Sequence, residues 1–185
     1  MANASLLDIS SDFQTYTNKN NINYINWHSP APLDYISKND TTRSIARYLR
    51  TYAFMRTFPD VILITSFFEG FTDNCFTEFD KDILTTPVLS IFYDLIPLIH
   101  PSLYLNANHA FSEFYLSKIK AIKEIDALLS ISLSSKNEAI KYLGFSSDKV
   151  KNISSACNTE LFNSLKVTKK NSSKVSLSLL KNYIL

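Results

Sequence analysis

Short apolar runs alternate along the chain with longer segments in which apolar residues recur every three or four positions. Four runs have the length of buried strands: 61–65, 87–92, 127–131 and 149–153. Residues 22–27 alternate apolar and polar side chains, as in a short half-buried strand. Helices are predicted over 40–55, 108–124 and 135–144. Because strands and helices alternate, the sequence predicts an α/β fold, a Rossmann-like parallel sheet with helices on both faces.

The first predicted helix has two different sides. Asp40 or Thr41 can cap its start. Apolar residues at helical spacing form the side that should face the core: Ile45, Tyr48, Leu49, Tyr52 and Met55. A basic stripe with one aromatic residue forms the opposite side: Arg43, Arg47, Arg50 and Phe54. The stripe could contact an anionic lipid surface or a partner, or it could be a solvated face with Phe54 packed under the next loop.

The two later helices also have recognisable signals. The helix over 108–124 has an apolar face made of Phe111, Phe114, Tyr115, Ile119 and Ile122. Ser135 and Glu138 have the spacing of a capping box, and Gly144 can end the helix that they begin. Both helices are of a length that fits between the strands of an α/β domain.

The segment that follows the strand over 87–92 carries the strongest candidate chemistry. Tyr93 and Asp94 come directly after this strand, and Pro97 and Pro101 predict that a rigid loop follows. Open α/β sheets bind ligands at the carboxyl ends of their strands. Asp94 could therefore orient or deprotonate a hydroxyl group of a substrate, or it could simply cap the amides of its own loop.

Other residues near predicted strand ends are candidates for substrate contact. Glu69 and Gly70 follow the strand over 61–65, and Ser132 follows the strand over 127–131. Tyr93 could donate a hydrogen bond to a ligand or pack as a core aromatic residue, and His100 lies between Ile99 and Pro101. Each has a structural alternative, namely a solvated loop acid for Glu69, a helix cap for Ser132 and a packed loop histidine for His100.

The composition excludes several classes of function. The 185 residues include only two glycines, Gly70 and Gly144, so neither a dinucleotide-binding motif nor a P-loop can be present. Cys75 and Cys157 lie far apart and form no metal-binding or redox motif. A net charge of +2 gives no reason to expect nucleic acid. Without a signal peptide or an apolar run of about 20 residues, we expect a cytoplasmic protein without a metal.

A series of short motifs occurs in a fixed order: Pro59-Asp60-Val-Ile-Leu-Ile, Phe68-Glu69-Gly70, Tyr93-Asp94-Leu-Ile-Pro97, Phe114-Tyr115-Leu-Ser-Lys-Ile-Lys, Ile125-Asp126-Ala-Leu-Leu-Ser-Ile-Ser132 and Lys149-Val-Lys-Asn-Ile. This order resembles the N-terminal half of bacterial family 4 glycosyltransferases over about residues 21–162. Members of that family have the GT-B architecture, in which two Rossmann-like domains face a cleft. The N-terminal domain holds the acceptor, and the C-terminal domain holds the sugar nucleotide.

The resemblance implies a domain division and a reaction. Residues 1–165 would form the acceptor-side domain without the usual first strand and Gly-rich loop, and residues 166–185 would be a linker and the start of a missing donor domain. The reaction would transfer a hexose from a sugar nucleotide to a glycan or lipid-linked acceptor, typically with retention. Asp94 would be catalytic, and the substrate-binding residues would be Glu69, Gly70, Tyr93, His100 and Ser132.

The resemblance also implies partners. No cofactor is expected in this chain, because the nucleotide sugar would bind the missing domain. A donor-domain polypeptide could pair with the chain, or the chain could self-associate through its aromatic loop at 66–82. We expect that the five phenylalanines of this loop are not all buried within the domain. The enzyme could lie at the periphery of the inner membrane through Arg43, Arg47, Arg50 and Phe54. The alternative function is an incomplete, non-catalytic glycosyltransferase domain that binds a glycan or a protein.

Overall fold

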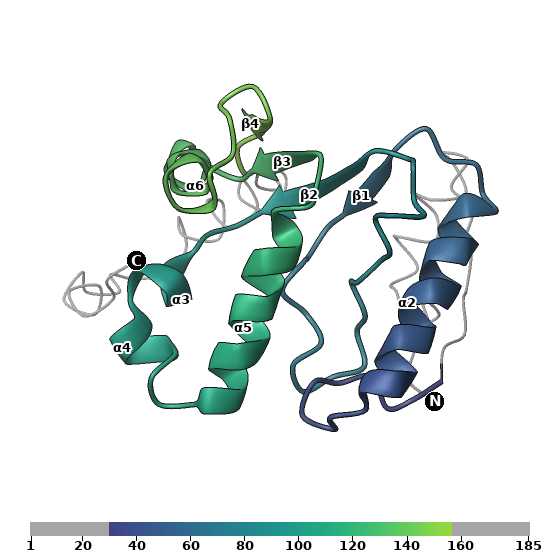
Figure 1. Cartoon of the computed structure of the whole chain (residues 1–185). Helices are drawn as coiled ribbons and strands as arrows, with labels where there is room; N and C mark the ends of the chain where they lie inside the picture. The colour runs from purple at the N-terminus through teal and green to yellow at the C-terminus, as the bar shows by residue number, and fades with distance from the viewer. Residues whose placement is uncertain (1–29, 157–185) are drawn as a thin grey trace, which may run out of the picture. The chain divides into compact units, whose positions relative to one another are not determined.

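The computed structural model describes residues 30–156, and its elements lie in the unit that ends at Ser154 (Figure 1). Four strands form one sheet in the order β1-β2-β3-β4. Their bounds are Ile62–Ile64 for β1, Val88–Phe92 for β2, Ala127–Ser130 for β3 and Val150–Asn152 for β4. All neighbouring strands pair in parallel. The predicted α/β class with a parallel, Rossmann-like sheet is confirmed.

The two faces of this sheet differ in burial. Val88 and Phe92 of β2 and Leu128 of β3 are fully buried on one face, as is Val150 of β4, and they pack with residues of the helices in one core. The opposite face carries Leu89, Ile91 and Leu129, which are half-buried, and Leu63 is 48% exposed. Within residues 30–156, one face is therefore covered fully and the other only in part.

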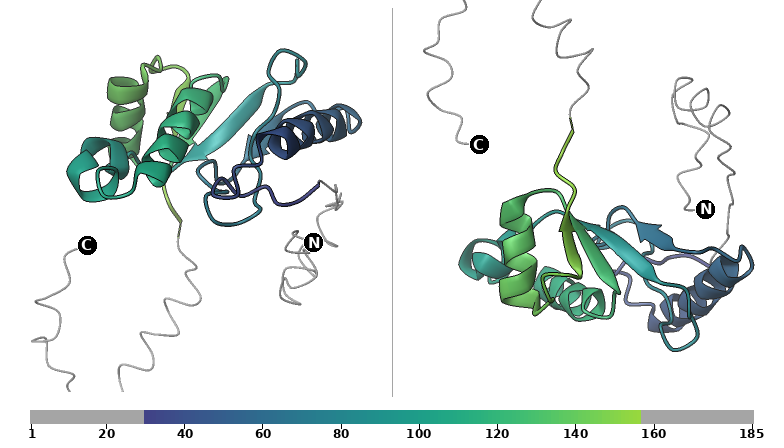
Figure 2. Two further views of the ribbon diagram at one scale, coloured as in Figure 1. Left: turned by 60° about the horizontal axis from the view of Figure 1, so that its bottom comes forward. Right: turned by 90° about the horizontal axis from the view of Figure 1, so that it is seen from above.

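The long helix that precedes β3 and the short helix that follows β3 lie beside the carboxyl end of the sheet. Helix α5 spans His109–Ile122 and is capped by Asn108, whose side chain accepts a hydrogen bond from the amide of Phe111 at 3.0 Å. The predicted core residues of α5 are buried or half-buried. Helix α6 spans Leu133–Glu138 and continues as the π-helical turn η2, Ala139–Leu143, which ends at Gly144. Figure 2 shows both helices from two further directions.

The predicted cap of α6 and the predicted loop after β2 were wrong. The cap of α6 is Ser132 rather than Ser135: the Ser132 hydroxyl accepts from the amide of Ser135 at 3.0 Å, and Ser135 is buried within the helix. The two prolines after β2 do not produce an irregular loop. They lie in the first turns of two short helices, α3 at Ile96–Ile99 and α4 at Pro101–Tyr104, where a missing amide hydrogen costs no helical hydrogen bond.

Helix α2, Asp40–Met55, faces the opposite way from the prediction. Its cap is Asn39, which accepts from the amide of Thr42 at 3.2 Å. The predicted core residues of this helix are between 41% and 60% exposed: Ile45, Tyr48, Leu49, Tyr52 and Met55. Arg43, Ala46 and Thr51 are buried instead. The arginine stripe therefore faces the domain rather than solvent, and Arg43 is not available to a lipid surface.

Polar contacts explain this orientation of α2. Arg43 donates hydrogen bonds to the carbonyl of Leu33 and to the carboxylate of Glu78. Arg50 donates to the carbonyl of Glu78 at 3.2 Å, and the hydroxyl of Thr51 accepts from the amide of Asp80 at 2.8 Å. The segment 78–80 thus offers hydrogen-bond acceptors and a donor to the polar side chains on the arginine face of α2. Apolar side chains could not satisfy these groups.

The aromatic loop at 66–82 folds back on the domain. Phe67 and Phe76 are buried, and Phe68, Phe71 and Phe79 are half-buried. Phe71 lies 5.2 Å from Phe111 and 5.3 Å from Phe114 between ring centroids. As expected, the five phenylalanines are not all buried, although α5 offers the half-buried rings an aromatic surface to pack on. Self-association or pairing with a partner through this loop stays a prediction.

Several sequence predictions lie outside the described residues. They are the strand over 22–27, Cys157, the domain boundary at 165 and the linker from 166 to 185. Within residues 30–156, no helix is long and apolar enough to cross a membrane, and no three His, Cys, Asp or Glu side chains are arranged to hold a metal ion.

Gly70 lets the aromatic loop bring its backbone close to the carbonyl of Cys75. A substitution at this position tests how much that close approach contributes to stability. Its φ is +95°, and an added Cβ would lie 2.3 Å from the carbonyl oxygen of Cys75. We expect Gly70→Ala to lower the free energy of unfolding by about 2 kcal/mol or more, from backbone strain and steric clash. Gly144→Ala is the matched control, because φ is +80° but no atom lies within 4 Å of the added Cβ. Equal losses for the two variants in urea unfolding would contradict the close approach.

Candidate functional site

A cleft of about 490 Å³ lies where β1 and β2 end. It is lined by Ser66, Phe67, Phe68, Glu69, Ile91, Tyr93, Asp94, Pro97, Phe111, Phe114 and Tyr115. The loop after β1 supplies Glu69, the loop after β2 supplies Tyr93 and Asp94, and α5 supplies the aromatic wall. The structure thus brings together Glu69, Tyr93 and Asp94, three of the residues that the sequence proposed for the site, at the carboxyl end of a parallel sheet.

Helix α6 holds the loop that carries Asp94. The hydroxyl of Ser135 donates to the carbonyl of Tyr93, and the carboxylate of Glu138 accepts from the amide of Leu95 at 2.9 Å. The backbone is therefore fixed on both sides of Asp94. Sequence reasoning missed both positioning residues, because Ser135 and Glu138 were interpreted only as a capping box.

Asp94 also takes part in its own loop. One carboxylate oxygen accepts from the amide of Ile96 at 3.0 Å, which is an Asx turn. The structural alternative for Asp94 is therefore present in the molecule. The same side chain is half-buried in the wall of the cleft, and a carboxylate has acceptor sites beyond the one that this turn uses. Its role toward a substrate stays a prediction.

Glu69 lines the same cleft from an exposed position. The hydroxyl of Ser66 donates to its carboxylate at 2.5 Å. This bond orients the carboxylate at the end of β1. Tyr93 is 51% exposed, so its phenol is not a core group and is free to meet a ligand.

The aromatic wall contains a polar group that sequence reasoning assigned to the core. Phe68 stacks on Tyr115 with 5.1 Å between ring centroids, and Phe111 lies 6.0 Å from Tyr115. The Tyr115 hydroxyl is buried and has no hydrogen bond of standard geometry within residues 30–156. Burial raises the pKa of Tyr115, the charge of Asp94 raises it further, and the backbone of Leu98 offsets part of the rise. Tyr115 is therefore a neutral donor in the wall beside Asp94.

The other three proposed site residues do not line the cleft. Gly70 is buried, and its carbonyl accepts from the amide of Tyr35 at 3.0 Å. His100 is exposed at the junction of α3 and α4. Ser132 caps α6, which was the structural alternative for it. Gly70 and Ser132 thus have structural roles, and a role of any of the three residues toward a substrate stays a prediction.

The contact between Glu138 and Leu95 can be tested directly. Glu138→Ala leaves the buried amide of Leu95 without its acceptor, so we expect unfolding to become easier by about 1–3 kcal/mol. The amide of Leu95 should also exchange with solvent faster. Asn137→Ala, at an exposed position of the same helix, should change stability by less than about 0.5 kcal/mol. Unchanged protection of the Leu95 amide in Glu138→Ala would show that α6 does not hold this loop.

Comparison with known proteins identifies relatives of this chain. No protein-family model and no solved structure matches it. Two serotype-specific mannosyltransferases WbdA of Escherichia coli are 33% identical to it over 132 residues, and a third is 35% identical over 127 residues. The matches cover 71% and 68% of this chain, but about 16% of the length of each mannosyltransferase. The chain is therefore homologous to a part of these glycosyltransferases. This homology confirms that its motifs resemble those of a glycosyltransferase.

Proposed function

We propose that this domain is the acceptor-side half of a glycosyltransferase of the GT-B architecture, similar to family 4, that transfers a hexose to a glycan or lipid-linked acceptor. The observation that supports this proposal best is the cleft, which is lined by Asp94, Tyr93 and Glu69 together with aromatic side chains. The name of the WbdA relatives suggests mannose as the hexose. The resemblance to family 4 suggests retention of configuration and a cytoplasmic nucleotide-sugar donor.

The proposed chemistry needs few groups from this domain. Asp94 accepts a hydrogen bond from the acceptor hydroxyl and takes its proton as the hydroxyl oxygen bonds to the anomeric carbon of the donor sugar on the face that the leaving phosphate occupies, so that configuration is retained. The bond between that carbon and the nucleotide phosphate breaks, and the nucleoside diphosphate leaves with the electron pair. Tyr93 donates a hydrogen bond to the acceptor, and Phe68 and Phe111 cover its apolar faces.

The scarcity of glycine supports the acceptor side rather than the donor side. A loop that binds nucleotide phosphates brings its backbone close to the anion and needs several glycines. Gly70 lies where its backbone closely approaches the carbonyl of Cys75, and Gly144 ends η2. Both glycines therefore have roles within the fold. The sugar nucleotide is accordingly assigned to a second domain.

The test uses an enzyme rebuilt by joining this chain to the C-terminal half of a homologous glycosyltransferase. Asp94→Asn should lower turnover about 100-fold, which is within the usual range for a positioned acid or base. It should cost less than about 1 kcal/mol of stability, because the amide oxygen can still accept from Ile96. Asp60→Asn, at an exposed position before β1, is the matched control and should leave turnover unchanged.

Three outcomes separate the alternatives. Full activity of folded Asp94→Asn would remove Asp94 from the mechanism and leave it as an Asx turn. Loss of activity in Asp94→Asn alone would support the proposal. Glycan binding by the wild-type chain without any transfer by the rebuilt enzyme would instead indicate a non-catalytic binding module.

A further inference from the structure

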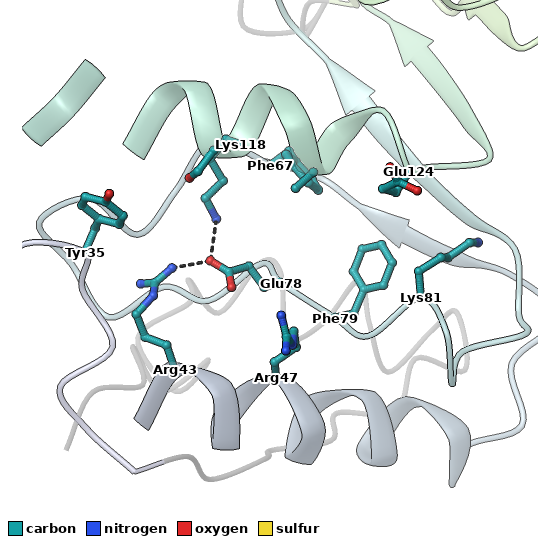
Figure 3. A pocket seen from close by; sticks show the side chains of 11 residues that line it. Tyr35, Arg43, Arg47, Phe67, Glu78, Phe79, Lys81, Lys118 and Glu124 are labelled. Atoms are coloured by element: carbon teal, nitrogen blue, oxygen red, sulfur yellow. Dashed lines mark hydrogen bonds and ion pairs between the residues drawn. The ribbon is translucent and has the colours of Figure 1, made fainter. Parts of the chain in front are cut away.

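A second cavity lies between α2 and α5, separate from the cleft that holds Asp94. Its volume is about 300 Å³, and Figure 3 shows the side chains around it. Phe67 lines both cavities, so its ring lies between them. The polar part of the second cavity has four cations and two carboxylates: Arg43, Arg47, Lys81, Lys118, Glu78 and Glu124. Its lining is therefore positive, with an excess of two charges when every group is ionised.

The carboxylate of Glu78 is shared by two of these cations. It accepts from Arg43, and it lies 3.9 Å from the ammonium of Lys118 (Figure 3). Lys118 is only 2% exposed, and its ammonium also donates a hydrogen bond to the hydroxyl of Thr77 at 2.7 Å and lies over the rings of Phe67 and Phe114. Burial, together with the charges of Arg43 and Arg50, lowers the pKa of Lys118 to about 8, although Glu78 opposes this shift. The carboxylate thus does not compensate the cations fully.

Among residues 30–156, no carboxylate forms an ion pair with Arg47. Its Nε is buried and has no hydrogen-bond partner within residues 30–156. Its guanidinium lies 5.6 Å from the ring centre of Tyr48, and it lines the cavity together with Arg43 and Phe79. A buried guanidinium donor without an acceptor is unfavourable and rare in folded proteins, so this side chain indicates where an anion would be stabilised.

The other cation of the lining is already paired. Lys81 donates to the carboxylate of Asp126 at 2.5 Å, and that carboxylate also accepts from the amide of Val88 at 2.8 Å. The uncompensated charge is therefore concentrated at Arg43, Arg47 and Lys118, which come from two helices. Guanidinium groups match the geometry of phosphate oxygens and bind them through more than one hydrogen bond.

We propose that the cavity between α2 and α5 binds a phosphate dianion through Arg47, Arg43 and Lys118. The anion accepts a hydrogen bond from the Nε of Arg47. It also offsets the positive charge of the cavity that Glu78 does not neutralise. Phe67 and Phe79 provide apolar walls for a group attached to the phosphate. The site is independent of the proposed glycosyl transfer, because none of these cations lines the cleft with Asp94. Free phosphate and a sugar phosphate share this chemistry, and the experiment distinguishes them.

The test is a titration of the full 185-residue chain with inorganic phosphate and with a hexose 6-phosphate, with the neutral hexose alongside. We expect a Kd of about 1 mM or tighter for a phosphate-bearing ligand and a shift of the Arg47 Nε–H signal in NMR spectra. Arg47→Gln should weaken binding about tenfold or more. It should not unfold the protein, because the Arg47 Nε makes no hydrogen bond within residues 30–156 that the substitution would remove. Arg56→Gln, at the exposed end of the same helix, should bind as the wild type does.

Both supporting results are specific. Tighter binding of the hexose phosphate than of phosphate would identify a phosphate ester as the ligand, whereas equal binding would identify free phosphate. The proposal is overturned if neither anion binds at this affinity, if Arg47→Gln binds as tightly as Arg56→Gln, or if the Arg47 Nε–H signal does not move.

Discussion

The carboxylate of Glu78 joins helix α2 to the rest of the domain. It accepts from Arg43, it faces Lys118 of α5, and the carbonyl of the same residue accepts from Arg50. Because these acceptors lie on the loop after β1, α2 must turn its arginine face inward, and its apolar face becomes the exposed one. The same junction packs the aromatic loop against α5 and leaves the positive cavity between the two helices. One half-buried carboxylate shared by two cations therefore connects α2, the loop after β1 and α5.

The cleft depends on a different set of contacts. Helix α6 fixes the loop after β2 through Ser135 and Glu138, and the Asx turn of Asp94 fixes it from within. Aromatic side chains from the loop after β1 and from α5 build the opposite wall. A rigid carboxylate beside rings and a buried phenol suits a polyhydroxylated acceptor. This arrangement connects the homology to glycosyltransferases with particular atoms of this chain.

Much of the fold could be predicted from the sequence, because its strands are short apolar runs and α5 has a regular apolar face. The orientation of α2 could not be predicted, since helical spacing shows which residues share a side but not that Glu78 and the backbone of 78–80 offer partners for arginine. Pro97 and Pro101 indicated a break, yet the first turn of a helix also accepts proline. In the site, strand ends identified Glu69, Tyr93 and Asp94. Tyr115 was missed because its ring follows the core pattern, and only tertiary structure shows its hydroxyl beside Asp94.

The central claim is that a buried charged junction, rather than an apolar interface, holds α2 on the domain. Titration of the side-chain NMR signal of Lys118 tests it most directly, because this ammonium is buried at the junction with Arg43 and Glu78. Burial and the neighbouring arginines predict a pKa of about 8. A midpoint near the ordinary value of 10.5 would show that Lys118 is solvated and that α2 does not pack through its arginine face.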